Sequence, residues 1–80
     1  GVTTPPLALG SSLYFGQGSE LVEIDPASGN PRRRLDLGQP LSGRPAAIGE
    51  RLIVGSSEGS FLVVNRTGWA AAESLGSEGE

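Results

Sequence analysis

The chain repeats one sequence pattern twice, with a period of about forty residues. PLALGSSLYFG, from Pro6 to Gly16, aligns with PAAIGERLIVG, from Pro45 to Gly55. The second copy then carries one additional residue, after which LVEID, ending at Asp25, aligns with FLVVN, ending at Asn65. Such a period is typical of proteins that stack supersecondary units, each burying an apolar face against the next. We therefore expect two similar units in succession.

Short apolar runs separated by glycine and proline predict that both units consist of β-strands. The 80 residues include 13 glycines and 6 prolines, and apolar residues do not recur at helical spacing over several turns. We expect an all-β fold with no long helix. The expected strands are 7–9, 12–15, 20–24 and 32–37 in the first unit, and 46–48, 51–54, 60–65 and 69–74 in the second.

The hydrophobic pattern predicts that some strands are buried on both faces. LIV, which begins at Leu52, and FLVV, which begins at Phe61, are continuous rather than alternating. The first strand of each unit carries small residues such as Ala8 and Ala46, whereas the last strand of the first unit is polar. This order of small, apolar and polar strands indicates that the first strand of a unit lies at a crowded centre and that the last strand faces solvent.

The turn sequences support four-stranded units. DPASG, from Asp25 to Gly29, combines an Asp that can accept a backbone N–H, a Pro with a preset φ and a Gly that tolerates positive φ. This predicts a hairpin loop between the third and fourth strands. NRTG, from Asn65 to Gly68, is interpreted as its shortened counterpart, with Asn and Gly again supplying the turn.

Both units resemble the pyrroloquinoline-quinone-type repeat of β-propeller proteins, whose pattern is roughly G-x-LYVG-x-x-DG-x-LYALDA-x-TGK-x-x-W-x-x-x-LG. The residues that carry the resemblance are Gly10, LYFG (13–16), LVEIDPASG (21–29) and LDLG (35–38), then Gly49, LIVG (52–55), Gly59, FLVVN (61–65) and TG (67–68). The family's tryptophan after the T-G turn is absent from the first copy, where Arg32 to Arg34 occupy that region. In the second copy Trp69 directly follows Gly68, a few residues early.

The resemblance implies two four-stranded antiparallel propeller blades, with residues 1–5 as a linker, 6–42 and 43–76 as the blades and 77–80 as a flexible tail. Two blades do not close a ring, because propellers typically use four to eight. The chain is therefore expected either to be part of a longer protein or to close a ring with further copies of itself. The start at Gly1 without a methionine favours excision from a longer chain.

The composition argues against several kinds of chemistry. Cysteine, histidine, lysine and methionine are absent, and six arginines oppose nine carboxylates for a net charge of −3. Serines therefore lack an ordinary base, the usual Cys/His metal ligands are missing, and no D-x-D-x-D-G calcium loop occurs. We expect no catalytic residue, no metal and no cofactor. The acidic balance argues against nucleic-acid binding, and apolar runs of about four residues predict no membrane insertion.

Three residues are candidates for binding a partner: Trp69, Arg32 and Arg34. Alternation along a strand places Arg32 and Arg34 on one face and Arg33 on the other, so the three do not form one patch. The three arginines are expected to protect an outer strand edge from aggregation, and the alternative is recognition of an acidic partner. Trp69 is expected to be buried between blades, and the alternative is an exposed anchor for a protein or sugar.

Other conspicuous side chains receive structural interpretations. Tyr14, Phe15 and Phe61 lie in expected strands and are predicted to belong to the core. The carboxylates of Glu20, Glu23 and Asp25 fall close together, and we expect them to be solvated or to cap the turn rather than to form a catalytic pair.

These observations favour a non-catalytic module that binds or scaffolds other proteins, its partner being a protein or further propeller blades. The family resemblance implies the periplasm or cell envelope, and the exclusive use of arginine as cation indicates a bacterial source with GC-rich coding. Two alternatives remain open. They are a fragment of a quinone-dependent dehydrogenase and a self-assembling carbohydrate-binding propeller.

Overall fold

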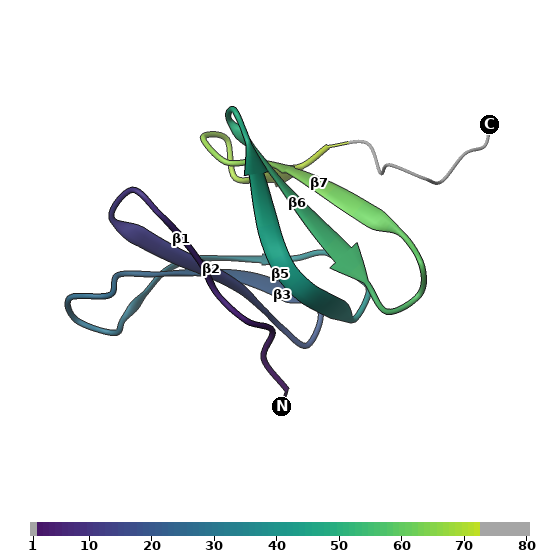
Figure 1. Cartoon of the computed structure of the whole chain (residues 1–80), viewed down its shortest axis with the longest axis horizontal. Helices are drawn as coiled ribbons and strands as arrows, with labels where there is room; N and C mark the ends of the chain where they lie inside the picture. The colour runs from purple at the N-terminus through teal and green to yellow at the C-terminus, as the bar shows by residue number, and fades with distance from the viewer. Residues whose placement is uncertain (1, 73–80) are drawn as a thin grey trace.

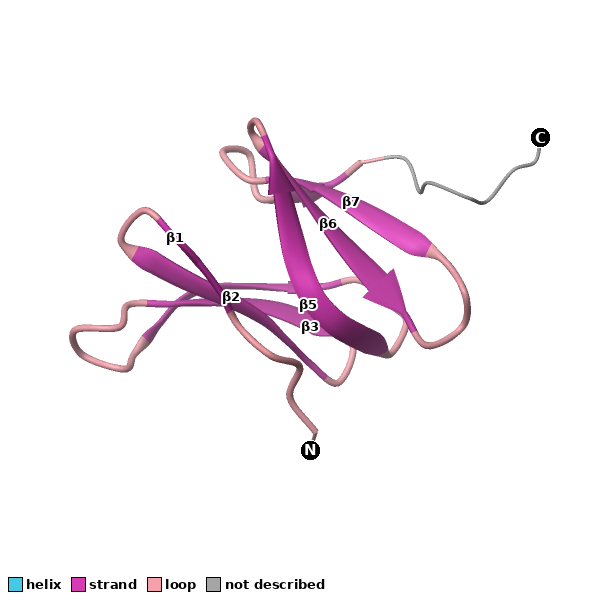
Figure 2. Cartoon of the chain, in the orientation of Figure 1, coloured by secondary structure: helices cyan, strands magenta, loops and turns pink. Residues whose placement is uncertain are grey.

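Each half of the chain folds into a meander in which every strand pairs with the next strand along the sequence. The computed structural model describes residues 2–72, which contain two four-stranded antiparallel sheets and no helix (Figures 1 and 2). The first sheet comprises β1 (Leu7–Leu9), β2 (Ser12–Gln17), β3 (Glu20–Ile24) and β4 (Pro31–Asp36). The second comprises β5 (Leu41–Ile48), β6 (Arg51–Ser56), β7 (Phe61–Asn65) and β8 (Ala70–Ala71). The predicted all-β fold of two blade-like sheets is confirmed.

The predicted strand boundaries fail mainly at β5. This strand begins at Leu41 rather than at Ala46, because a register shift between Ser42 and Ala46 lets it bulge and continue. Gly43 lies within the bulge and has a φ of 81°. β1 and β3 have the predicted bounds. Part of the expected strand 69–74, and the expected tail 77–80, lie outside the described residues.

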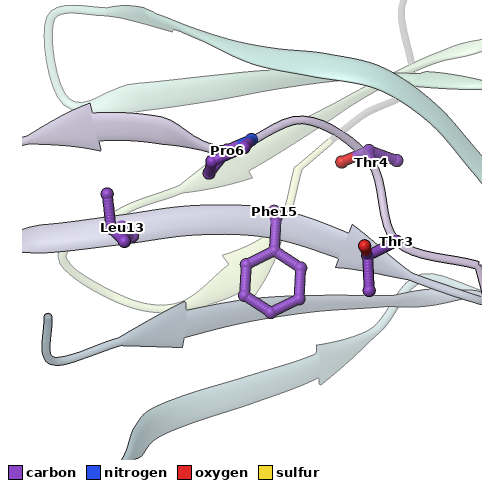
Figure 3. Close-up of a pocket in the computed structure, with 5 residues that line it drawn as sticks. All are labelled: Thr3, Thr4, Pro6, Leu13 and Phe15. Carbon is purple, nitrogen blue, oxygen red and sulfur yellow. The ribbon is translucent and has the colours of Figure 1, made fainter. Parts of the chain in front are cut away.

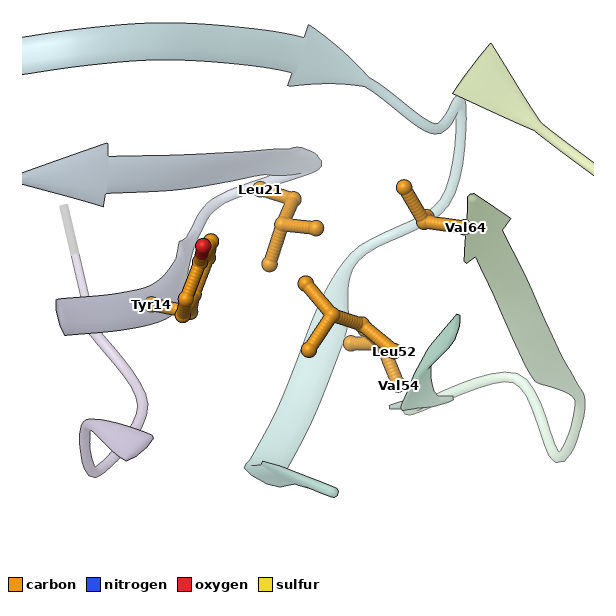
Figure 4. Close-up of a cluster of buried hydrophobic side chains, with 5 residues drawn as sticks. All are labelled: Tyr14, Leu21, Leu52, Val54 and Val64. Carbon is orange, nitrogen blue, oxygen red and sulfur yellow. The ribbon is translucent and has the colours of Figure 1, made fainter. Parts of the chain in front are cut away.

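The core lies between the two sheets, which pack face to face. Its fully or nearly fully buried side chains point toward one another across this space (Figure 4), namely Tyr14, Leu21, Leu52, Val54 and Val64. Three consecutive residues of β7, from Leu62 to Val64, are buried, which confirms the prediction that this strand is covered on both faces. Phe61 was expected in the core but is 56% exposed, because its face of the second sheet points away from the first.

The sheets approach most closely where β5 packs against β2 and β1. β5 contacts both β1 and β2 (Figure 1), whereas the arginine-bearing β4 forms the far edge of the first sheet, as predicted. At the contact, Leu41 lies directly over Gly16, where a methyl group built on the glycine would be 2.8 Å from Leu41 Cβ. Gly16 is therefore needed for close approach rather than for a special backbone conformation.

Replacing Gly16 by alanine should lower the free energy of unfolding by about 1–3 kcal/mol, because the added methyl group overpacks the contact with Leu41. Gly55 occupies the corresponding place in the second sheet, and there the nearest atom to a built methyl group is the Ser42 carbonyl oxygen at 3.0 Å. Gly55→Ala should thus cost less than Gly16→Ala. Urea denaturation of both variants measures the difference, and equal costs would contradict the assigned role of Gly16.

Candidate functional site

The turn between β7 and β8 places Trp69 at a backbone position that normally favours glycine. In the first sheet the corresponding turn closes with a hydrogen bond from Gly29 N to the Asp25 carbonyl oxygen, at 2.7 Å. In the second sheet Trp69 N donates to the Asn65 carbonyl oxygen, also at 2.7 Å. The two turns therefore have the same length, and the interpretation of the second as shortened is wrong. Trp69 takes the place of Gly29 and has a φ of 52°.

The strained backbone of Trp69 is held by contacts to the first sheet. Its indole ring lies 4.3 Å below the guanidinium carbon of Arg33, a cation–π geometry, and 6.2 Å from the ring of Tyr14. Its Nε1–H donates a hydrogen bond of 3.0 Å to the Arg34 carbonyl oxygen. Trp69 is half-buried and joins the two sheets, as the first of its two interpretations predicts. Binding of a partner by this residue stays a prediction.

Arg33 and Tyr14, which contact Trp69, both bind a buried carboxylate, that of Glu23. Its Oε2 accepts hydrogen bonds from Ser12 Oγ at 2.8 Å and from the Tyr14 hydroxyl at 3.0 Å. Its Oε1 accepts from Nε of Arg33. The Glu23 side chain is 7% exposed and that of Arg33 is 34% exposed. Since Arg33 also donates to the Arg66 carbonyl oxygen of the second sheet, at 3.0 Å, this ion pair connects the two sheets.

The expectation that Glu23 is solvated or caps the turn is therefore wrong. Glu23 is two residues from Leu21 on the same strand, and alternation places both side chains on the face that meets the second sheet. This alternation with Leu21 is the sequence signal from which the burial of Glu23 could have been predicted. Asp25, in contrast, caps its turn as expected, since its carboxylate accepts from Ala27 N at 3.0 Å and from Ser28 Oγ at 3.2 Å.

The surroundings of Glu23 keep it ionised. Burial by itself would raise its pKa, but the hydrogen bonds from Arg33, Ser12 and Tyr14 and the charge of Arg33 outweigh burial and lower the pKa below its ordinary value. The pKa of Tyr14 is raised, first by burial and then by its hydrogen bond to the Glu23 carboxylate. Both pKa shifts favour the same state, in which the neutral Tyr14 phenol donates a hydrogen bond to the ionised Glu23 carboxylate.

Because the pKa of Glu23 is lower in the folded state than in the unfolded chain, the unfolded state binds more protons in acid. The stability that Glu23 contributes is therefore present at neutral pH and should be lost as the pH falls below about 4.5, the ordinary range of a glutamate. The pKa values of Asp25 and Glu50 are also lowered, so the Glu23→Gln variant serves as the comparison. The stability advantage of the unmodified chain over Glu23→Gln should shrink between about pH 7 and about pH 3 in urea denaturation. A constant difference would contradict the assignment.

The three arginines of β4 lie next to three different carboxylates, those of Asp25, Glu23 and Glu20. Arg32 donates to Ser12 Oγ at 2.8 Å and lies 3.4 Å from a carboxylate oxygen of Asp25. Arg34 lies 3.2 Å from a carboxylate oxygen of Glu20. Both of these ion pairs are partly exposed, whereas Arg33 enters the contact between the sheets. Arg32 and Arg34 are thus accessible on the surface, and their binding of a partner stays a prediction.

On its other face, the first sheet carries an open apolar hollow of about 250 Å³. Figure 3 shows the residues that line it: Thr3, Thr4, Pro6, Leu13 and Phe15. Leu13 and Phe15 come from β2, and the remaining three belong to the segment before β1. Phe15 is therefore half-buried at the edge of this hollow rather than in the core.

Within residues 2–72, no three Asp or Glu side chains converge as metal ligands would. No helix in this part of the chain could span a membrane. The titratable groups with shifted pKa values lie in one hydrogen-bonded cluster or at turns: Tyr14, Glu23 and Arg33 form the cluster, Asp25 lies in its own turn, and Glu50 lies beside Thr67 and Arg66. The fold thus defines a pair of stacked, blade-like antiparallel sheets. No protein-family model matches the chain, and comparison with curated proteins found none of significant sequence similarity.

Proposed function

We propose that this chain is a non-catalytic scaffold module built of propeller-type repeats, which binds other proteins or further blades through its surface. The observation that carries the proposal is the exposure of large apolar side chains outside the core. Val2 is 84% exposed, Ile48 68% and Phe61 56%. Exposed apolar surface of this kind marks sites of protein association.

The arrangement of charged groups supports a scaffold rather than an enzyme. Glu23, the buried carboxylate, is bound by Arg33 and two hydroxyls, so its proton affinity is lowered instead of being set for proton transfer near neutral pH. It stabilises the contact between the sheets. A location in the bacterial cell envelope belongs to the same proposal and is supported by the resemblance of the repeats alone.

Two alternatives remain to be separated by experiment. A fragment of a quinone-dependent dehydrogenase would bind pyrroloquinoline quinone, and a carbohydrate-binding propeller would use an exposed aromatic ring over a polar groove. Trp69 is half-buried against Arg33 and Tyr14, and the hollow beside Phe15 is lined mainly by apolar groups. Neither place combines an open ring with a polar groove.

The test combines an absorbance titration with pyrroloquinoline quinone, a glycan array and affinity capture from cell-envelope extract. We expect no saturable spectral change, no glycan binding and capture of a specific protein. Sugar binding that is lost in Trp69→Ala and kept in Arg34→Ala would overturn the proposal in favour of the carbohydrate-binding alternative. A saturable change in the quinone spectrum would overturn it in favour of the dehydrogenase fragment.

A further inference from the structure

We propose that Trp69 closes the open edge of the first sheet and so prevents β4 from pairing with the β4 of a second copy of this chain. The inference goes beyond the proposed scaffold function and does not depend on it. It concerns the strand that carries the three arginines, Pro31–Asp36. We call the side of β4 that faces away from β3 the open edge.

β4 has a strand neighbour on one side only within residues 2–72. It pairs with β3 and ends the order of strands in its sheet. Its six residues are a usual length for a paired strand. An unpaired edge presents a row of backbone N–H and C=O groups that can pair with another chain. The first sheet therefore needs a means of closing this edge.

The register between β3 and β4 identifies the backbone groups that face the open edge. Val22 lies opposite Arg34, and in the same register Leu37 N donates to the Ser19 carbonyl oxygen at 2.8 Å. Hydrogen-bonded and non-hydrogen-bonded pairs alternate along an antiparallel ladder. Arg34, three residues before Leu37, therefore belongs to a non-hydrogen-bonded pair. Its backbone N–H and C=O groups point away from β3.

Trp69 binds the outward carbonyl group of Arg34. The indole Nε1–H donates a hydrogen bond of 3.0 Å to this oxygen. The ring is fixed by the guanidinium group of Arg33, 4.3 Å from its centre, and by Tyr14. Since Trp69 comes from the turn between β7 and β8, the second half of the chain supplies the group that covers the edge of the first sheet. A strand that paired with β4 at Arg34 would have to displace the indole.

The start of β4 is unsuited to pairing because of its own sequence. Pro31 has no backbone N–H to donate to a neighbouring strand. The register shift opposite Glu23 and Ile24 distorts the same end of the strand. Arg34 and Asp36, which has the same phase, are then the positions at which a strand could add. Trp69 occupies the first of these two positions.

The partner that this edge fits is a second β4 in antiparallel orientation. Pairing centred on Arg34 sets the two copies of this residue opposite each other, each with an outward N–H and an outward C=O. The same register sets Arg32 of each copy beside Asp36 of the other, and opposite charges on paired strands attract. The two Arg34 side chains repel each other, although Glu20, at 3.2 Å, offsets part of each charge.

Charge repulsion by arginine is an incomplete barrier, because salt screens charges on the surface. The hydrogen bond from the uncharged indole of Trp69 is not weakened in this way. Arginine and tryptophan thus protect the edge by different means, and in salt the protection depends on Trp69. The sequence-based expectation that the arginines protect this edge names only one of the two.

The absence of cysteine from the chain allows a direct test. Residues opposite each other in a hydrogen-bonded antiparallel pair have Cα atoms about 5.5 Å apart, within reach of a disulfide. Arg34→Cys combined with Trp69→Gly should form disulfide-linked dimers on the order of tenfold faster than Arg34→Cys alone. Both chains lack the charge of Arg34, so they differ only at Trp69. Glycine is chosen because it tolerates the φ of 52° at this position.

A cysteine far from the edge provides the matched control. Glu58 is exposed in the turn between β6 and β7, so Glu58→Cys should form dimers at the same rate with and without Trp69→Gly. Equal rates for Arg34→Cys with and without Trp69→Gly would overturn the proposal. An equally large increase for Glu58→Cys would overturn it too, because loss of Trp69 would then promote contact at any surface.

A proline on the open edge separates edge pairing from a general loss of stability. At about 0.5 M salt, where charges are screened, light scattering should give Trp69→Gly a larger mass than the unmodified chain. Trp69→Gly with Arg34→Pro should return to the mass of the unmodified chain, because proline removes the outward N–H and leaves the bonds to β3 in place. Trp69→Gly with Arg34→Ala keeps this N–H and should retain the larger mass.

Gly16→Ala controls for lower stability, since it overpacks the contact with Leu41 while Trp69 stays in place. Its mass should equal that of the unmodified chain. A larger mass for Gly16→Ala, or proline and alanine at position 34 giving the same mass, would overturn the proposal. Circular dichroism verifies that each variant is folded. Should Trp69→Gly not fold, Trp69→Phe, which keeps a ring and lacks the N–H, takes its place in both tests.

Discussion

Replacing Arg33 by leucine should lower the free energy of unfolding by about 3 kcal/mol, the lower end of the range for removing one partner of a buried ion pair. Glu23 would stay buried with its charge uncompensated, and the cation–π contact with Trp69 and the hydrogen bond to the Arg66 carbonyl would be lost as well. The lower end applies because the Arg33 side chain is 34% exposed. Urea denaturation at neutral pH, followed by circular dichroism, measures the loss.

The neighbouring Arg34 provides the matched control. Its ion pair with Glu20 is partly exposed, so Arg34→Leu should change stability by no more than about 1 kcal/mol. A double-mutant cycle of Arg33→Leu with Glu23→Gln should show a coupling energy of about 1–3 kcal/mol between the two sites. Similar losses for Arg33→Leu and Arg34→Leu would show that the position of Arg33 between the sheets is energetically unimportant.

Replacing Trp69 by alanine should cost about 2–3 kcal/mol, below the full range for a core tryptophan because the ring is half-buried. The variant loses the contacts with Arg33 and Tyr14 and the hydrogen bond to the Arg34 carbonyl oxygen. Since Trp69 is the only tryptophan, circular dichroism rather than fluorescence follows unfolding of this variant.

The backbone of Trp69 predicts an unusual order of substitutions. Glycine in a strand or turn normally costs more than alanine, but at a φ of 52° a side chain costs about 1–2 kcal/mol that glycine avoids. Trp69→Gly should therefore be more stable than Trp69→Ala by about 1 kcal/mol. Gly29→Ala, in the matching turn with a φ of 79°, should lose a similar amount. Alanine as stable as glycine at position 69 would contradict the left-handed conformation.

Much of the fold could be predicted because the repeat and the strand periods are local properties. The continuous apolar run at β7 specified burial on both faces, and the structure buries Leu62, Val63 and Val64. The bulge in β5 could not be predicted, since no hydrophobic alternation marks the Ser42–Ala46 segment. Phe61 was misassigned because an apolar strand residue does not indicate which face of a sheet meets a neighbour.

The candidate site was predicted only in part. Trp69 was correctly predicted to lie between the two sheets, but the contacts of Arg33 with Trp69 and with the Arg66 carbonyl oxygen were not predicted. Glu23 was missed because a carboxylate is rarely buried unless paired, and its partner Arg33 lies on a different strand. The pairing follows from the register that sets Glu23 opposite Arg33.

The sequence by itself determined that this protein has two similar all-β units, since the forty-residue repeat and the strand-length apolar runs are written along the chain. Only the tertiary structure decided which faces meet. The physical reason is that only one face of each sheet meets the other sheet, and nothing local distinguishes Leu21, fully buried, from its counterpart Phe61, which is exposed. Stacking also placed Trp69 of the second half of the chain against Arg33, whose pairing with Glu23 is set within the first sheet.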